Sequence, residues 1–272
     1  MTAQFDTTKP NAARMYDYWL GGKDNFEADR VAAEAVRELR PNVAEQALDN
    51  KRFQTRAVGY VADQGVRQYL DVGSGLPTSP VPGAAFPPLW LPTHVAAAAA
   101  DPVVAYIDND PVAVLHSQAL LAGGSRRVVA VHGDMCDPMA ILGHDDIQRV
   151  GIDLGAPVCV VLACVLHFVE ANTARSIVSA FTQALVPGSY VIATVGFAKG
   201  TGGDNFARTY NSQAGPRIYA HSWEQITALF DGLDLMPPGI VDTAAWRPGW
   251  QETGLAERSS MIVGGVGRKS RA

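Results

Sequence analysis

Apolar residues recur at helical spacing along the N-terminal part of the chain. Between residues 26 and 39, Ala32, Val36 and Leu39 repeat every three or four positions, which is typical of one helix face turned to a core. Gly21-Gly22 and Pro41 interrupt the pattern, because glycine and proline favour turns. The pattern predicts helices over residues 12–20, 26–39 and 43–66.

From residue 68 the pattern changes to short aliphatic and β-branched runs that alternate with helical segments. This alternation is the signature of a parallel sheet with helices on its faces. The runs predict strands over residues 68–72, 103–107, 127–132, 158–163 and 189–195, with helices over 111–121 and 172–185. The C-terminal part predicts a helix over 222–230, and strands over 233–240 and 260–266 that pair as an antiparallel hairpin across the loop 241–258.

One segment departs from this alternation. Six of the 17 prolines fall within residues 77–92, and Pro87-Pro88 forbids a regular helix there. We expect an irregular lobe over 77–92, followed by a short alanine-rich helix over 94–100. The expected organisation is an N-terminal helical cap or lid (1–66) on an α/β domain (67–272) that carries this insertion, together forming one structural unit.

Composition narrows the class of protein. Of 272 residues, 47% are hydrophobic and 18% charged, which supports a large core and argues against disorder. A net charge of −5 disfavours a nucleic-acid partner, because such binding needs an excess of Lys and Arg. Three cysteines without a Cys-x-x-Cys pair indicate neither a disulfide framework nor a structural metal site.

Targeting signals are not evident at the N-terminus. The start of the chain has no apolar segment behind a charged one, so no secretory signal is expected. The most apolar stretch, 156–169, is shorter than the roughly 20 residues of a membrane span. We expect a cytoplasmic protein without membrane contact, as a monomer or homodimer.

The end of the first predicted strand carries the strongest local motif, Asp71-Val72-Gly73-Ser74-Gly75. Glycines in such a turn let the backbone approach a bound nucleotide. By itself the motif is weak, since glycine pairs also mark ordinary turns. Position 78 is Thr rather than the third glycine of a dinucleotide fingerprint, which argues against a pyrophosphate ligand. Asp71 suits a ligand with a positively charged group.

Two further carboxylates follow the next predicted strands. Asp110 before Pro111 is a good helix N-cap, which leaves Asp108 free to accept hydrogen bonds from ribose hydroxyls. Asp134 after the third strand either caps a turn or accepts from an adenine amino group, with Met135 against the ring.

In this order and spacing, the three motifs resemble class I S-adenosylmethionine-dependent methyltransferases. The run NAARMYDYWLGGKDNF (11–26) resembles the N-terminal signature of an actinobacterial methyltransferase family once known only as a domain of unknown function. The segments VGSGLPT (72–78), YIDNDP (106–111), LHFV (166–169) and WRP (246–248) resemble it too, so the similarity covers nearly the whole chain. It implies a Rossmann-like, seven-stranded sheet in the order 3-2-1-4-5-7-6.

The resemblance also implies a cofactor site for S-adenosylmethionine, whose product is S-adenosylhomocysteine. Gly73 and Gly75 would line the methionine part, Asp108 the ribose, and Asp134 with Met135 the adenine. Ser74, Asn109 and Ala163 at the same strand ends, with Asp71, complete the expected set.

The N-terminal signature has two interpretations. In one it is an amphipathic helix that packs Tyr and Trp on the core and leaves its charges in solvent. In the other it is a lid, in which Arg14 or Lys23 meets the methionine carboxylate and Tyr16 packs beside the sulfonium. Closure of such a lid would exclude water.

The candidate for catalysis is His167, which follows the fourth strand and could take a proton from an acceptor. A single histidine among apolar residues is more often structural, and Cys164 is interpreted as a core residue. Acceptor contacts are expected from the loop 197–219 and the proline-rich lobe. The candidate acceptor-site residues are Phe168, Tyr210, Tyr219 and His221, with Phe86 and Trp90 in the lobe.

The sequence therefore predicts methyl transfer from S-adenosylmethionine to a small-molecule O, N or C acceptor, with no metal. Two other classes remain open. One is a protein that binds S-adenosylmethionine without transferring the methyl group, and the other is an NAD-dependent oxidoreductase. The presence of Asp71 and the absence of the third glycine count against an NAD-dependent oxidoreductase.

Overall fold

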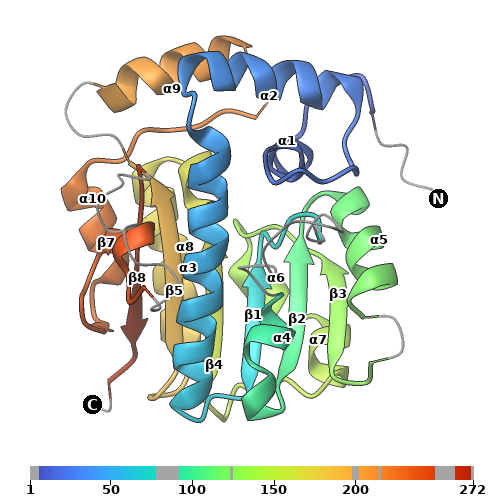
Figure 1. Ribbon diagram of the computed structural model, residues 1–272. Helices are drawn as coiled ribbons and strands as arrows, with labels where there is room; N and C mark the ends of the chain where they lie inside the picture. The colour runs from blue at the N-terminus through green and yellow to red at the C-terminus, as the bar shows by residue number, and fades with distance from the viewer. Residues whose placement is uncertain are drawn as a thin grey trace.

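A central sheet divides the molecule, with helices on both faces and a further group of helices across one end (Figure 1). The computed structural model describes residues 6–77, 92–122, 125–197, 202–213, 216–248 and 261–270. The strands are β1 Gln68–Val72, β2 Val103–Asp108, β3 Val128–His132, β4 Val158–Ala163, β5 Tyr190–Gly196, β6 Asp234–Leu235, β7 Val241–Asp242 and β8 Ile262–Arg268. The proline-rich lobe, with Phe86 and Trp90, lies almost wholly outside the described residues.

The strand order is β3-β2-β1-β4-β5-β8-β6, and β7 pairs with β8 beside this path. The first five strands are parallel, and β8 is antiparallel to both β5 and β6. This is the predicted order, because β8 corresponds to the seventh strand expected from the sequence. The predicted α/β class and antiparallel hairpin are confirmed.

The C-terminal strands differ in extent from the prediction. The strand expected over 233–240 is limited to β6, since the prolines at 237 and 238 have no N–H to donate to a neighbouring strand. The loop expected over 241–258 contains the short strand β7. These changes leave the expected pairing intact.

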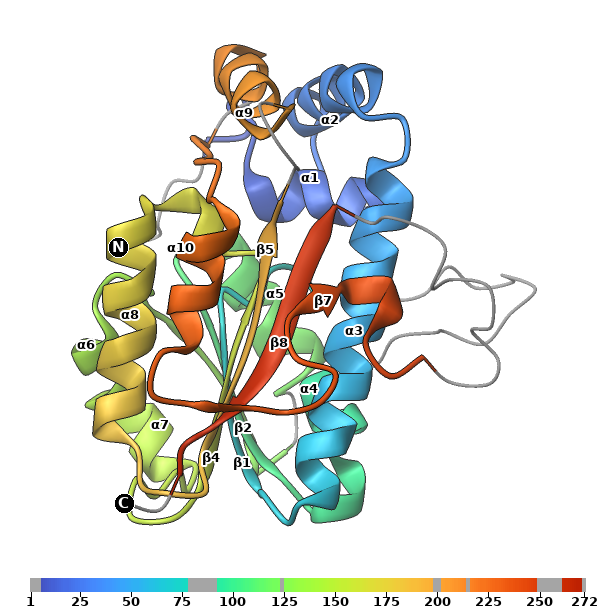
Figure 2. The same ribbon diagram turned by 90° about the vertical axis from the view of Figure 1, so that its left-hand side faces the viewer.

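Each face of the sheet carries its own hydrophobic core. On one face α3 Val43–Asp63 packs with α4 Thr93–Ala96 and η1 Ala98–Ala100 against the strands. The other face is covered mainly by α6 Pro138–Leu142, α7 Asp145–Arg149 and α8 Ala171–Ala184. Figure 2 shows these two layers on either side of the strands. The remaining elements are α5 Pro111–Leu120, η2 Leu166–Phe168, α10 Trp223–Thr227, η3 Ala228–Phe230 and η4 Thr243–Ala245.

The helices α1 Ala12–Trp19, α2 Glu27–Leu39 and α9 Gly202–Gln213 lie across the carboxyl end of the parallel strands (Figure 1). They form a separate hydrophobic cluster, which includes Met15, Val36 and Tyr210. The three predicted N-terminal helices are confirmed. The helix α9 was expected to be loop, and it corrects that interpretation. We call α1, α2 and α9 the roof.

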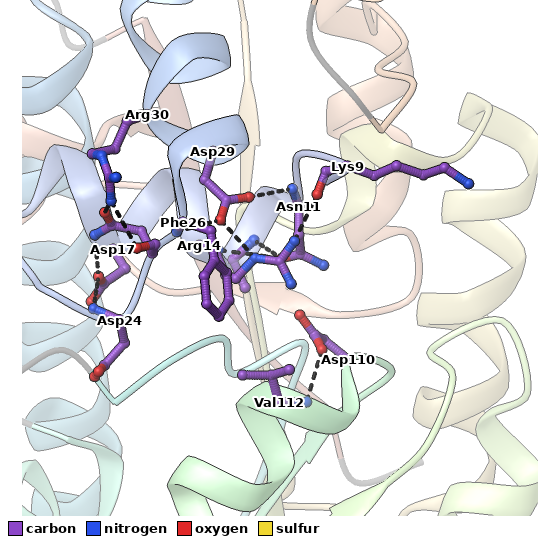
Figure 3. A network of polar contacts seen from close by, with 12 residues as sticks. Lys9, Asn11, Arg14, Asp17, Asp24, Phe26, Asp29, Arg30, Asp110 and Val112 are labelled. Atoms are coloured by element: carbon purple, nitrogen blue, oxygen red, sulfur yellow. Dashed lines mark hydrogen bonds and ion pairs between the residues drawn. The ribbon is translucent and has the colours of Figure 1, made fainter. Parts of the chain in front are cut away.

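Polar side chains of the N-terminal signature hold the roof together (Figure 3). The buried carboxylate of Asp29 accepts from Arg14 Nε at 2.8 Å and from the backbone N–H groups of Asn11 and Phe26, both at 2.8 Å. Asn11 in turn caps α1 by accepting from Ala13 N–H at 2.8 Å. Two helices that are separate in sequence are thus joined through an ion pair that is almost completely buried.

A second carboxylate of the signature organises the turn after α1. Asp17 Oδ2 accepts from the Asp24 backbone N–H and from Asn25 Nδ2, each at 3.0 Å. A Cβ at Gly22 would lie 1.9 Å from Asp17 Oδ1, so only glycine fits against this side chain. The glycine-rich turn is therefore built around Asp17.

Candidate functional site

A cavity of about 530 Å³ lies between the carboxyl ends of the parallel strands and the roof. Ligands of open α/β sheets bind at this edge. The cavity has two parts, a polar one over β1, β2 and β4 and an aromatic one under α2 and α9. The polar part is lined by Gly73, Ser74, Gly75, Asp108, Asn109, Gly133, Met135, Ala163 and Cys164, with Tyr16, Asn50 and Lys51 opposite them.

The turn after β1 brings backbone to the cavity surface. Gly73 and Gly75 both have a φ of 69°, a left-handed conformation that disfavours side chains. A Cβ at Gly73 would lie 2.3 Å from Val165 Cγ1, so this turn also needs glycine for space. The N–H groups of Gly73 and Ser74 donate to the Ile107 carbonyl at 2.8 and 3.1 Å. The turn is thereby fixed beside the end of β2.

Asp108 ends β2 and faces the same turn. Its Oδ2 accepts from the Gly75 backbone N–H at 2.7 Å and its Oδ1 from Asp110 N–H at 2.9 Å. Burial raises the pKa of the Asp108 carboxyl, and these two donors oppose the rise. Each oxygen keeps a lone pair for a ligand hydroxyl. Asp110 caps α5 through Val112 N–H, as predicted.

Lys51 on α3 is the cation of the polar part. Its Nζ lies 3.4 Å from Gln54 Oε1 and 5.9 Å from the centroid of the Tyr16 ring. Burial lowers the pKa of the ammonium, and the charges of Asp71 and Asp108 oppose that effect. A half-buried ammonium beside two carboxylates suits a ligand that carries charges of both signs.

A chain of hydrogen bonds fixes the floor of this part. Tyr16 Oη donates to the Ala47 carbonyl and accepts from Asn50 Nδ2, both at 2.9 Å. Thr194 Oγ1 donates to Asn50 Oδ1 at 2.8 Å and accepts from the Cys164 backbone N–H at 2.8 Å. Burial raises the pKa of Cys164 to about 11, so its thiol is protonated at neutral pH.

The aromatic part lies between α2, α9 and the segment after β4. Its aromatic and histidine side chains are Trp19, His167, Phe168, Phe197, Phe206, Tyr210, Tyr219 and His221. His221 Nε2 lies 3.0 Å from the Val169 carbonyl, an acceptor, so this nitrogen carries the proton. The other ring nitrogen, Nδ1, is buried and has no hydrogen-bond partner among the described residues. It is a buried acceptor without a donor, on a residue that lines the cavity.

A model of the S-adenosyl methyltransferase family matches residues 1–270. The chain belongs to this family. No curated protein matches the chain at a significant level. Among the described residues of this methyltransferase, no helix combines the length and apolar character needed to cross a membrane.

Two solved structures resemble this methyltransferase over its whole length. A crystal structure from Thermobifida fusca is 35% identical, covers 98% of this chain and 97% of its own, and has a TM-score of 0.86. The crystal structure of a DUF574 family protein from Streptomyces avermitilis is of a chain that is 32% identical. The match covers 98% of this chain and 100% of that chain, with a TM-score of 0.86. An O-methyltransferase family protein from Burkholderia thailandensis is 13% identical over 97% of this chain and 65% of its own, with a TM-score of 0.51, and shares the fold.

Most residues expected to form the site do lie around one cavity. Gly73, Ser74, Gly75, Asp108, Asn109, Met135, Ala163 and Tyr16 line the polar part, and His167, Phe168, Tyr210 and Tyr219 line the aromatic part. The strand-end residues meet because parallel strands bring their carboxyl ends to one edge of the sheet.

Three expected cofactor residues lie outside the cavity wall. Asp71 is buried behind it, where Oδ2 accepts from Thr93 Oγ1 at 2.6 Å and Gln54 Nε2 at 3.0 Å. Arg14 is paired with Asp29. Asp134 is exposed and accepts from the Cys136 backbone N–H at 2.9 Å. Lys23, the other cation expected in the lid, is also exposed and outside the wall.

Sequence reasoning missed two cations that do line the cavity, Lys51 and Arg40. The signal for Lys51 is a polar stripe within an otherwise buried helix face. Gln46, Asn50 and Gln54 repeat every four residues on α3, and all three are buried. Buried amides on a helix need partners, which indicates a polar site on that face. Arg40 follows α2 and has no comparable signal.

His167 is neutral at physiological pH. Burial, followed by electrostatic interactions with His221 and Arg40, lowers the pKa of the imidazole to about 4. The Gly196 backbone N–H lies 3.5 Å from its Nδ1, which favours the proton on Nε2. In this state Nε2 is a hydrogen-bond donor rather than a base.

This pKa predicts a pH-dependent contribution to stability. The unfolded chain binds a proton on this histidine near pH 6.5 but the native state only near pH 4, so acidification between these values favours unfolding. At pH 5 the loss for His167 is roughly 1–2 kcal/mol. Urea unfolding of wild type and His167→Gln at pH 7.5 and pH 5 should show a smaller loss in the variant. Equal losses would contradict the assignment.

Proposed function

We propose that the protein transfers the methyl group of S-adenosylmethionine to a small-molecule acceptor bound in the aromatic part of the cavity. The observation that carries the proposal is one cavity with two chemically different parts. Glycine backbone, a buried carboxylate and an ammonium line one part, and aromatic rings line the other. The acceptor bears an oxygen, nitrogen or carbon nucleophile.

The residues of the polar part fit the cofactor. S-adenosylmethionine supplies a methyl group on a positively charged sulfur, beside an amino acid group that carries an ammonium and a carboxylate. Lys51 would contact the carboxylate, and Asp108 would accept from the ribose hydroxyls. The glycine turn after β1 allows close approach of the ligand to the backbone. Met135 would pack on the adenine.

The chain's remaining task is to hold the acceptor and exclude water. The roof covers the strand ends, and its aromatic side chains offer an apolar surface to a planar acceptor. Burial lowers the pKa of His221, so its imidazole is neutral and adds no charge to the wall of this part. Positioning of this kind contributes a large part of the rate in many bimolecular reactions.

A protein that binds the cofactor without transferring its methyl group is the alternative. The aromatic part of the cavity favours transfer, because such a protein has no need of a second compartment. Calorimetric titration with S-adenosylmethionine, S-adenosylhomocysteine and NAD in parallel is the first test, and binding of the first two alone supports the site. Turnover with a panel of phenols, amines and carboxylic acids then separates an enzyme from a binding protein.

We expect Asp108→Ala to weaken binding of S-adenosylhomocysteine by about 1.5–3 kcal/mol, the usual value of hydrogen bonds to a charged group. The matched control is Asp134→Ala, which removes an exposed carboxylate outside the cavity wall. Calorimetry measures both, and circular dichroism checks that the variants fold. Normal binding by folded Asp108→Ala would refute the ribose contact. Stronger loss in Asp134→Ala would instead support the adenine contact predicted from the sequence.

A further inference from the structure

The aromatic part of the cavity carries a positive charge. Its charged side chain is Arg40, which lies with the neutral histidines His167 and His221, whereas the carboxylates in the described wall of the cavity are Asp17 on α1 and Asp108 at the end of β2. The protein as a whole carries a net charge of −5, so this positive region is opposite in sign to the average. A region of one sign inside a low-dielectric cavity attracts a ligand of the other sign.

Arg40 supplies the charge. It follows the last residue of α2, and its guanidinium carbon lies 3.7 Å from the centroid of the Phe206 ring on α9. Stacking on a ring occupies the flat face of the guanidinium and leaves its N–H donors pointing outward in the plane. In the described part of the chain, no side-chain hydrogen bond or ion pair engages these donors.

Such a cation lacks the partner that burial usually requires. Burial lowers the pKa of Arg40 to about 10, and the group is still charged at pH 7. A half-buried charge without an anion costs free energy, which a bound oxyanion would recover. Planar guanidinium groups bind carboxylate and phosphate oxygens in pairs. The wall around it includes the aromatic rings already described and aliphatic side chains such as Val36 and Ile218.

We propose that the methyl acceptor is an aromatic molecule carrying an oxyanion, a carboxylate or a phosphate, which binds the guanidinium of Arg40. This assignment rests on the proposed function, since it places the acceptor beside the cofactor. The ring of the acceptor packs among Phe168, Phe206 and Tyr210, and its anionic group lies under the roof. The proposal concerns recognition of the acceptor and adds no chemical step.

The test measures binding to protein saturated with S-adenosylhomocysteine. The probes are the three hydroxybenzoates, their carboxamides as uncharged counterparts, and phenyl phosphate with phenol as its neutral counterpart. We expect at least one anion to bind about tenfold or more tightly than its neutral counterpart, as for one charge-assisted contact. If a hydroxybenzoate binds more tightly than its carboxamide, the anionic group of the acceptor is a carboxylate. If phenyl phosphate binds more tightly than phenol, that group is a phosphate.

Variants connect any preference to Arg40. Arg40→Gln should abolish the preference while leaving affinity for S-adenosylhomocysteine unchanged, and Arg40→Lys should keep part of it. Arg37→Gln is the matched control, because this arginine of the same helix pairs with Glu34 outside the cavity. The Arg37→Gln variant should prefer anions over their neutral counterparts to the same extent as wild type.

The outcomes separate the two proposals. Equal binding of anions and neutral counterparts by wild type, or a preference that survives in Arg40→Gln, overturns the assignment of the acceptor. Failure of wild type to bind S-adenosylhomocysteine, measured first on the same sample, overturns the proposed function itself. The wild-type comparison requires no variant, so it holds even if Arg40→Gln does not fold.

Discussion

Lys51→Met is expected to weaken binding of S-adenosylhomocysteine by roughly 2–4 kcal/mol, a 30- to 1000-fold loss. The ammonium lies in the wall of the polar part, where Asp71 and Asp108 are the nearby negative charges. Removing it would leave the ligand carboxylate near these two negative groups with no ammonium to offset their charge. Methionine keeps an unbranched side chain that is one atom shorter, so the change removes mainly the charged group.

The control for this prediction is Lys23→Met. Lys23 is the lysine of the N-terminal signature, exposed and outside the cavity wall, and its loss should leave binding unchanged. Lys51→Arg keeps the charge and should retain much of the affinity. Calorimetry on the three variants decides the matter. A larger loss in Lys23→Met than in Lys51→Met would return the carboxylate to the lid predicted from the sequence.

Asp29→Asn is expected to lower the free energy of unfolding by about 3–5 kcal/mol, the usual cost of removing one partner of a buried ion pair. The side chain of Asp29 is 0% exposed and that of Arg14 is 4% exposed, so the remaining guanidinium would have little contact with water. The substitution also weakens the contacts to the backbone N–H groups of Asn11 and Phe26. The roof should loosen first.

Urea unfolding measures this loss. Glu34→Gln is the matched control, because it breaks an exposed pair with Arg37, keeps an oxygen that can accept from Tyr18 Oη, and should cost less than about 1 kcal/mol. The double variant Arg14→Met with Asp29→Asn should be more stable than Asp29→Asn alone, since it removes the unpaired charge. A double variant that is less stable by the sum of the two single losses would show that the pair is not coupled.

The sheet could be predicted from the sequence because its signals are local. Parallel strands buried on both faces read as continuous apolar runs, and β1, β2 and β4 match the predicted ranges within one residue. The helix α9 has no such signal. It begins at a glycine pair, and its residues are largely polar, so it was interpreted as loop. Phe206 and Tyr210, four residues apart, become informative only when α2 is present to pack against them.

The site residues also divide into those with a local signal in the sequence and those that depend on tertiary packing. Gly73 and Asp108 could be predicted because strand ends of a parallel sheet share an edge. Arg14 was expected at the ligand, and its partner Asp29 is a residue of another helix that sequence spacing does not connect to it. Lys51 and Arg40 reach the cavity because α3 runs along the face of the sheet and α2 lies across its end (Figure 1). The direction of a helix across a sheet depends on packing of the whole molecule.

The roof has a hydrophobic cluster of its own, separate from the cores on the two faces of the sheet. Substitutions in α9 can therefore reshape the aromatic part of the cavity while the strands that carry Asp108 and the glycine turn keep their packing. On the proposed function, gene duplication followed by divergence of residues 202–213 is a short evolutionary route to new enzymes. Such descendants would share one methyl donor and differ in the molecules they modify.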